Sequence, residues 1–160
     1  MKYAAIGMMI LLILALVGVG YLYMTCTVTV DAAGVIAVDA ATQPELLDQL
    51  REQMALGSVV GTAFSTGELK ASDAYQFYTY TVRLTNHCMI TADMVEVQVT
   101  PMDGDVMQLG DTAPKALGSQ ATGDIQATIL TTKDMHAVRE LTVTYYMWGI
   151  PFSTKTTYGG

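Results

Sequence analysis

The residues of this chain that could supply a nucleophile and a base are Cys88, His87 and His136. A thiol attacks a carbonyl carbon when a histidine takes its proton and a third polar group orients that histidine. His87 adjoins Cys88 in the sequence, but neighbouring side chains on a strand or turn generally point apart. The chain has no Gly-x-Ser-x-Gly elbow and no glycine-rich phosphate loop. We therefore expect a protein that is not an enzyme and that needs no cofactor.

Three acidic residues, Asp103, Asp105 and Asp111, could bind a metal ion. Calcium is a hard cation that takes carboxylate oxygens from loops, so the 103–111 segment is a candidate calcium site. The longer acidic series and the closing glutamate of an EF-hand are missing, and Asp-Gly-Asp is also common turn material. The sequence leaves both interpretations open.

Cys26 and Cys88 are the two cysteines of the chain. An even number of cysteines permits one disulfide if both residues face an oxidising space. Nothing in the sequence sets the distance between them, so two free, half-buried thiols are the other interpretation.

Aromatic residues gather near the carboxyl end of the chain. Alternation places Leu141, Val143, Tyr145 and Met147 on one face of a strand, with Tyr146 and Trp148 on the other. Both faces are apolar, so the second face is either buried or exposed to a partner. We take Tyr146, Trp148 and Phe152 as candidate partner-binding residues, with burial under a helix at 43–56 as the alternative.

The elements that position these residues begin with a long apolar run, because no charged residue lies between Lys2 and Asp31. As a helix, residues 3–24 would be about 33 Å long. That length matches a hydrocarbon core of about 30 Å and exceeds the roughly 7–15 apolar residues of a signal peptide. We predict a retained transmembrane signal anchor over 1–24. A cleaved signal stays open, because Gly18 and Gly20 are small enough for signal peptidase.

The charges around this helix predict its orientation. Lys2 and the terminal amine precede it, and no Lys or Arg follows until Arg51. Positive charge stays on the cytoplasmic face. We therefore expect a single-pass protein of the cell membrane with a cytoplasmic amino terminus and residues 25–160 outside.

The outer part has the composition of a β-rich domain, with many Thr, Val and Tyr residues. One helix is predicted at about 43–56, with Thr42 and Glu45 as a capping box and Gly57 just past its end. Its apolar stripe consists of Leu46, Leu47, Leu50 and Met54. Strands are expected at 25–30, 35–38, 59–65, 75–86, 94–100, 106–109, 123–131, 139–149 and 151–159, the last two as a hairpin.

A resemblance accompanies this pattern. The segment TYTVRLTNHCMITADMVEVQVTP, followed by ALGSQATGDIQATI and a final strand pair, resembles bacterial envelope domains of the FxLYD type, which one N-terminal helix tethers to the membrane. Such domains run strand, Asn-containing turn, strand, Gly-rich turn, and residues 75–158 follow that order, although the Phe-x-Leu-Tyr-Asp string itself is absent. The resemblance implies an immunoglobulin-like fold and a location outside the membrane, and it carries no catalytic motif.

Together these features predict a mainly β protein: an N-terminal transmembrane helix, then an immunoglobulin-like antiparallel β-sandwich with one short helix. The net charge of −7 argues against nucleic acid as a partner. We expect a non-catalytic, membrane-tethered module that acts in protein–protein interaction or envelope structure, with another envelope protein as its partner. The alternative function is a ligand or calcium sensor that uses the 103–111 loop.

Overall fold

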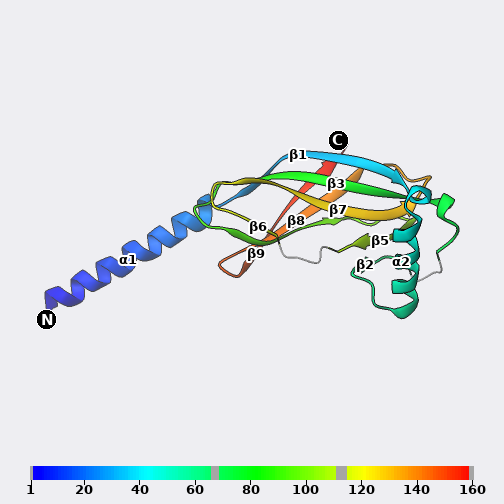
Figure 1. The fold of residues 1–160 in the computed structure, drawn as a ribbon. Helices are drawn as coiled ribbons and strands as arrows, with labels where there is room; N and C mark the ends of the chain where they lie inside the picture. Colours follow the sequence, from blue (N-terminus) through cyan, green and yellow to red (C-terminus); the bar gives the residue numbers. More distant parts are fainter. Residues whose placement is uncertain (1, 66–68, 111–114, 159–160) are drawn as a thin grey trace.

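The computed structural model describes residues 2–65, 69–110 and 115–158. It begins with α1 (Lys2–Thr25), of which 23 residues, Tyr3–Thr25, are apolar and long enough to cross a membrane. Figure 1 shows that α1 projects from one end of an elongated β domain. We call that end of the domain the proximal end and the opposite end the distal end.

The domain consists of two antiparallel sheets packed face to face, as the alternating strands predict. Strands are numbered in chain order. Across one sheet the main strands are the first, third, seventh and fifth, and across the other they are the fourth, eighth and ninth. This is the order of an immunoglobulin constant-type sandwich. Two short strands extend the edges. The five-stranded sheet runs β1 (Val28–Asp39), β3 (Tyr75–Asn86), β7 (Thr122–Thr132), β5 (Asp105–Leu109), β2 (Gly61–Ala63); the four-stranded sheet runs β6 (Lys115–Leu117), β4 (Ala92–Val99), β8 (Arg139–Met147), β9 (Ile150–Tyr158).

The main core forms where the predicted inward faces meet. Alternation on β3 buries Tyr78, Tyr80, Val82 and Leu84, and all four belong to one core built from residues of both sheets. The partners from the other strands are those that the pattern predicts: Val95, Val97, Val99, Ile125, Ala127, Ile129, Leu141, Val143, Tyr145 and Met147. The hydroxyls of Tyr78 and Tyr80 donate to the carbonyls of Met135 and Ala137, at 2.8 and 2.9 Å, and so fasten the loop between β7 and β8.

Two of the predicted strand boundaries are wrong. Residues 25–30 and 35–38 were expected as separate strands, but Thr25 is the last residue of α1, and residues 28–30 and 35–38 belong to one twelve-residue strand, β1, with a bulge between Val30 and Ala32. Gly34 does not make a turn, because β3 is equally long and pairs with β1 throughout, with Gly34 opposite Thr81. The 59–65 segment is shorter than expected, since only Gly61–Ala63 pairs with β5.

The hairpin between β8 and β9 is tighter than the sequence indicated. Met147 pairs with Ile150, so Trp148 and Gly149 alone form the turn, with φ angles of 52° and 76°. Two positive φ angles in a two-residue hairpin loop define a type I′ turn. Trp148 therefore stands in a backbone conformation that side chains other than Asn, Asp and Gly rarely adopt.

The predicted helix is α2 (Pro44–Leu56), and it ends at Gly57 as expected, with φ 63°. The capping box is wrong: Gln43 occupies the cap position without a side-chain bond. Thr42 instead donates to the carbonyl of Asp39, whose carboxylate accepts from the Ala41 N–H. Asp39 thereby caps a short 3₁₀ turn, η1 (Ala40–Thr42). The Thr42 hydroxyl is engaged in this turn and does not cap α2.

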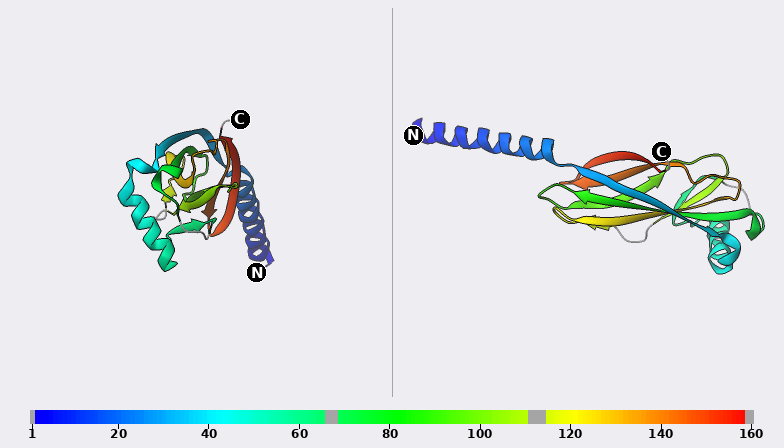
Figure 2. Two further views of the ribbon diagram at one scale, coloured as in Figure 1. Left: turned by 90° about the vertical axis from the view of Figure 1, so that its right-hand side faces the viewer. Right: turned by 90° about the horizontal axis from the view of Figure 1, so that it is seen from above.

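A second, smaller core lies under α2. Leu47 and Leu50 are buried against Tyr75, Phe77 and other residues of the first sheet: Val106, Met107 and Leu130. The figures show α2 at the distal end, with a second short 3₁₀ turn, η2 (Ser72–Ala74), in the same connection (Figures 1 and 2). The alternative that helix 43–56 covers Tyr146 and Trp148 is therefore wrong, because α2 packs at the other end of the sandwich.

Candidate functional site

The acidic loop places its three candidate ligands differently. Asp105 is buried, and its carboxylate forms an ion pair with Arg139 at 3.1 Å while its second oxygen accepts the Met102 N–H at 2.7 Å. Asp103 is exposed, and Asp111 lies outside the described residues. The structure thus assigns Asp105 to a buried ion pair, so it cannot offer its oxygens to calcium without breaking that pair.

Arg139 belongs to the same buried pair. Its guanidinium also donates to the carbonyls of His136 and Val138, at 2.7 and 3.0 Å. These bonds hold the loop that precedes β8 against the β4–β5 turn, so the arrangement is structural. Within the part of the chain that the structure describes, no group of three or more His, Cys, Asp or Glu residues is placed to hold a metal ion.

His87 and Cys88 point to opposite sides of their strand end, as their adjacency predicts. The His87 ring is exposed and lies 3.0 Å from the hydroxyl of Thr29. That hydroxyl donates to Asp31, so His87 is the donor in its contact with Thr29. Cys88 is buried, and burial raises the pKa of its thiol to about 12. A protonated thiol with no base beside it is not an activated nucleophile.

The two cysteines, in contrast, come together. Val28 pairs with Asn86, and the His87 N–H donates to the Thr27 carbonyl at 3.0 Å, which carries the pairing one residue further. Cys26 directly precedes this point on one side and Cys88 directly follows it on the other, so the two thiols lie close together. Burial is the main cause of the raised pKa of Cys88, and a hydrogen bond with the Cys26 thiol raises that pKa further. Both thiols are reduced in the structure.

Asn86 organises the turn that holds Cys88. Its buried amide donates to the carbonyls of Ile90, Leu117 and Gly118, at 2.8, 3.1 and 2.9 Å. Its oxygen accepts the Cys88 N–H at 2.9 Å. One side chain therefore ties the β3–β4 loop to the β6–β7 loop.

The three candidate partner-binding residues divide into two kinds. Phe152 is half-buried, and its ring stacks on Tyr145 at 5.7 Å and contacts Tyr23 of α1 at 5.6 Å. Tyr146 and Trp148 are 36% and 55% exposed. Phe152 thus joins the apolar helix to the sandwich, whereas Tyr146 and Trp148 are free to contact something outside the chain.

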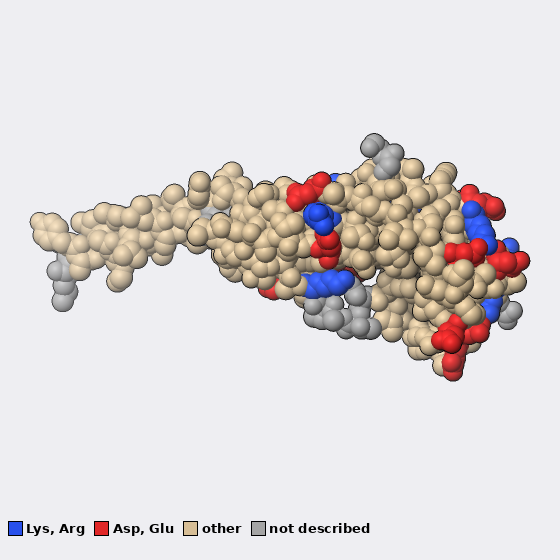
Figure 3. All heavy atoms as spheres, turned by 45° about the horizontal axis from the view of Figure 1, so that its top comes forward, with Lys and Arg blue, Asp and Glu red and all other residues tan. Residues whose placement is uncertain are grey.

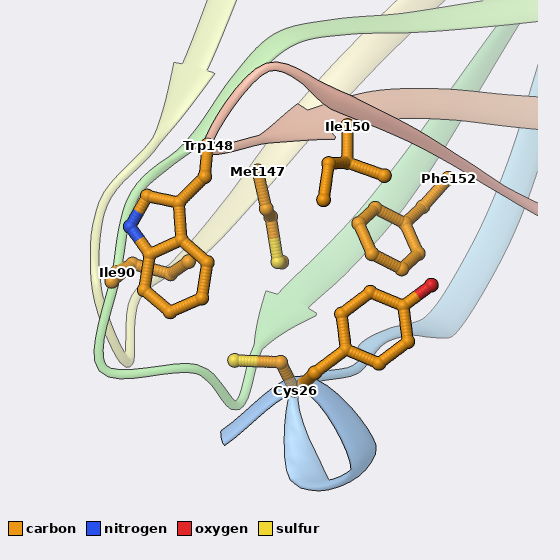
Figure 4. Close-up of a pocket in the computed structure, with 7 residues that line it drawn as sticks. Cys26, Ile90, Met147, Trp148, Ile150 and Phe152 are labelled. Atoms are coloured by element: carbon orange, nitrogen blue, oxygen red, sulfur yellow. The ribbon is translucent and has the colours of Figure 1, made fainter. Parts of the chain in front are cut away.

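Around this junction lies an apolar hollow, which Figure 4 shows between the end of α1 and the β8–β9 turn. Its volume of about 10 Å³ gives room for one water molecule at most, so it is not a small-molecule site. Trp148 and Ile150 lean over it from the hairpin, and Ile90 from the β3–β4 loop (Figure 4). The lining residues are Tyr23, Cys26, Ile90, Met147, Trp148, Ile150 and Phe152.

Sequence reasoning named Trp148 but missed Met89, Ile90 and Ile150, which lie at the same end of the domain. A signal was present, since these apolar residues fall in segments without charge. It could be interpreted only once the fold showed that those segments meet. Comparison with protein-family models, with curated proteins and with solved structures finds no match to this chain.

Proposed function

We propose that this protein is a membrane-tethered, non-catalytic β-sandwich module that contacts another envelope protein outside the membrane. The observation that carries the proposal is the junction between α1 and the domain. Tyr23 of the apolar helix packs on Phe152, so helix and sandwich form one continuous unit. A segment destined for removal has no reason to share an aromatic contact with the mature domain, which supports an anchor that stays.

The sign of the flanking charge supports an outward-facing domain. Lys2 precedes α1, and no basic residue lies in the last turn of that helix or in the connection to β1. By the positive-inside rule, the sandwich is then outside the cytoplasm. The strand order and the Asn86 turn are consistent with the FxLYD-type resemblance, and membership of that group is part of this proposal.

The residues that could have performed chemistry support a non-catalytic role. Cys88 is a buried thiol, His87 is bonded to Thr29, and Asp105 is paired with Arg139. The calcium-sensor alternative receives no support from Asp105, so we do not carry it forward.

For the contact with a partner we propose the outer face of β4 and β8 around Tyr146. Tyr146 pairs with Asp93, and the adjoining Met94 is an exposed apolar residue at the bulge of β4. Exposed aromatic and methionine side chains side by side are typical of protein interfaces.

The tether can be tested on intact cells. Protease added outside should remove residues 26–160, whereas alkaline carbonate should leave the intact chain in the membrane. Protection of the domain from protease would refute the orientation. Release of the whole chain by carbonate, or a mature amino terminus beyond Met24, would refute the anchor.

The partner contact can be tested by cross-linking in membranes followed by purification of the full chain. Tyr146→Ser should abolish the cross-linked partner while the domain stays folded. Met102→Ser is the matched control, because Met102 is also an exposed apolar residue but lies at the distal end. Equal recovery of the partner with both variants would contradict the proposed face.

A further inference from the structure

The loops at the proximal end form one surface next to α1. The β3–β4 loop contacts the β6–β7 loop, because Gln120 N–H donates to the Cys88 carbonyl at 3.1 Å and Asn86 N–H to the Ala121 carbonyl at 2.9 Å. The β8–β9 turn reaches the same place through the Tyr23–Phe152 contact. Three loops and the start of β1 therefore surround the point where the apolar helix leaves the domain (Figures 1 and 2).

The segments that form this surface contain no Asp, Glu, Lys or Arg, although the exposed Asp93 of β4 adjoins it opposite Tyr146. The chain is 14% Asp, Glu, Lys and Arg, yet none of these types occurs in residues 25–30, 86–92, 117–122 or 146–152. The four segments lie far apart in the sequence, so their common lack of charge is a property of this end of the fold. On the face that Figure 3 shows, no Lys, Arg, Asp or Glu is seen on the part of the domain nearest α1, and charges begin at a belt further along.

The belt contains the first charged residues of the long strands. Arg83 of β3 forms an ion pair with Asp124 of β7 at 2.8 Å, and Asp31 of β1 accepts from Thr85 and Thr29. Arg83 is separated from the loop at Cys88 by about 17 Å of strand. That length exceeds the roughly 5–10 Å to which interfacial elements enter a bilayer, so the Arg83–Asp124 pair stays in water when the loops touch lipid.

The loops instead expose large apolar side chains. Met89 is 72% exposed, Trp148 55% and Ile150 43%. Trp148 and Ile150 line the hollow beside Tyr23 of α1, and Met89 is in the loop that supplies Ile90 to the same hollow. Trp148 also has the left-handed backbone of the type I′ turn, where Asn or Gly is the ordinary residue. A tryptophan in this backbone conformation lowers the stability of the folded domain. Its presence there indicates that the exposed side chain makes a favourable interaction with something outside the domain.

We propose that the proximal end of the sandwich rests on the outer membrane surface, with Trp148, Ile150 and Met89 in the headgroup layer. The proposal depends on the proposed function, since it needs α1 in the bilayer. The occupant is the lipid itself: the surface is continuous with α1, it lacks charge, and it presents the amphipathic aromatic type that favours the membrane–water boundary. No Lys or Arg lies in the four segments, so zwitterionic lipid is sufficient.

The chain contains a built-in probe, because Trp148 is its single tryptophan. The experiment uses the full chain in phosphatidylcholine vesicles whose lipids carry bromine near the top of the acyl chains. We expect bromine to remove most of the Trp148 emission and dissolved acrylamide to quench it weakly. Strong quenching of the Trp148 emission by acrylamide, with no quenching by brominated lipid, would overturn the proposal. The surface would then be accessible from water and could bind a protein.

A matched pair of single-tryptophan variants separates the two ends of the domain. Ile150 and Met102 are each 43% exposed, but Ile150 is proximal and Met102 distal. With Trp148→Phe in both, Ile150→Trp should be quenched by brominated lipid and Met102→Trp by acrylamide. If both variants respond alike, the domain does not stand with its proximal end on the membrane.

Flotation of the same vesicles distinguishes failure of this proposal from failure of the tether. A chain that does not float with the vesicles refutes the anchor, and hence the proposed function. If the chain floats with the vesicles but its Trp148 emission is quenched only by acrylamide, the proposed contact of the proximal end with lipid is refuted and the anchor is not.

Discussion

Asn86 shows how a single buried side chain can organise the proximal end of the domain. Its amide group bonds three carbonyls and one N–H in the β3–β4 loop and at the end of β6. Such groups cost free energy when they are buried without a hydrogen bond. The position of Cys88, and through it the pairing with Cys26, depends on this residue.

We expect Asn86→Ala to lower the free energy of unfolding by about 3 kcal/mol, because it leaves the Cys88 N–H and several carbonyls unpaired. Urea unfolding of the full chain in detergent, followed by circular dichroism, measures the change. Met89→Ala in the same loop is the control and should cost less than about 0.5 kcal/mol, since Met89 is exposed. Equal effects of the two variants would contradict the role of Asn86.

The cysteine pair gives a second prediction for individual residues. In an oxidising space, Cys26 and Cys88 should form a disulfide, since the two thiols lie within hydrogen-bonding reach of each other where β1 and β3 meet. A disulfide-bearing oxidoreductase of that space would accept the two electrons and two protons. Alkylation of the denatured, unreduced protein should then label neither cysteine.

The variants Cys26→Ser and Cys88→Ser serve as controls for this prediction, because each should leave the other thiol open to labelling. Two labelled thiols in unreduced protein from its own membrane would show that both cysteines stay reduced.

Among the elements, the β8–β9 hairpin and β1 show how backbone conformation limits what a position accepts. Gly149 has φ 76° in the hairpin turn, whereas Gly34 lies within the extended β1 strand. A side chain added at either position would meet open space, so only the backbone distinguishes them.

We therefore expect Gly149→Ala to destabilise the domain by about 1–2 kcal/mol, the cost of a left-handed conformation for an L-residue. Gly34→Ala should leave stability unchanged or raise it by about 0.5 kcal/mol, because it restricts the unfolded chain without strain. Urea unfolding of both variants checks the difference. A destabilised Gly34→Ala variant would contradict the assignment of residue 34 to a continuous strand.

The whole molecule is polarised along its length. An apolar helix leads into a charge-free end, and charged residues gather in the belt and around the distal end (Figure 3). The ion pairs Lys133–Asp39, Arg83–Asp124 and Lys155–Glu140 are all solvent-exposed. Individually such pairs contribute little to stability. In each of them, however, the pKa of the acidic partner is lowered, so all three weaken when the pH falls.

Acid should destabilise the domain in a defined window. Hydrogen bonds from Lys133, Arg83 and Lys155 lower the pKa of Asp39, Asp124 and Glu140, and Thr85 and Thr29 lower the pKa of Asp31. Because these pKa values are lower in the folded state, the stabilisation is present above the unfolded pKa of about 4. It is lost as pH falls through the folded values.

Urea unfolding between pH 6 and pH 2 measures this loss. Arg83→Met removes the partner of Asp124 and should make the decline below about pH 4 less steep. A decline that is identical in the variant would show that the Arg83–Asp124 pair contributes nothing to acid sensitivity.

Several features of the fold could be predicted from local sequence. The apolar run of α1, the alternation along β3, β4 and β8, and the end of α2 at Gly57 each depend on residues close together in the chain. The immunoglobulin-like sandwich followed from the number and spacing of such strands. Where local signals were weak, prediction was wrong: two strands were expected at 25–30 and 35–38, but pairing with β3 keeps β1 continuous through Gly34.

The candidate site could be predicted only in part. The sequence identified Trp148 and Tyr146 as unusual, and it raised a disulfide between Cys26 and Cys88 without a means to judge their separation. The pairing of the start of β1 with the end of β3 brought the two cysteines close together. The pairing of Asp105 with Arg139 could not be foreseen either, because the two residues lie on different sheets.

By itself the sequence determined that a membrane-length apolar helix precedes a β-rich domain, because hydrophobic length and period are local quantities. Only the tertiary structure decided that four uncharged segments meet around the end of that helix, and that α2 packs at the opposite end. The physical reason is that strand pairing joins residues across long stretches of chain. A shared surface therefore exists only after the strands have chosen their neighbours.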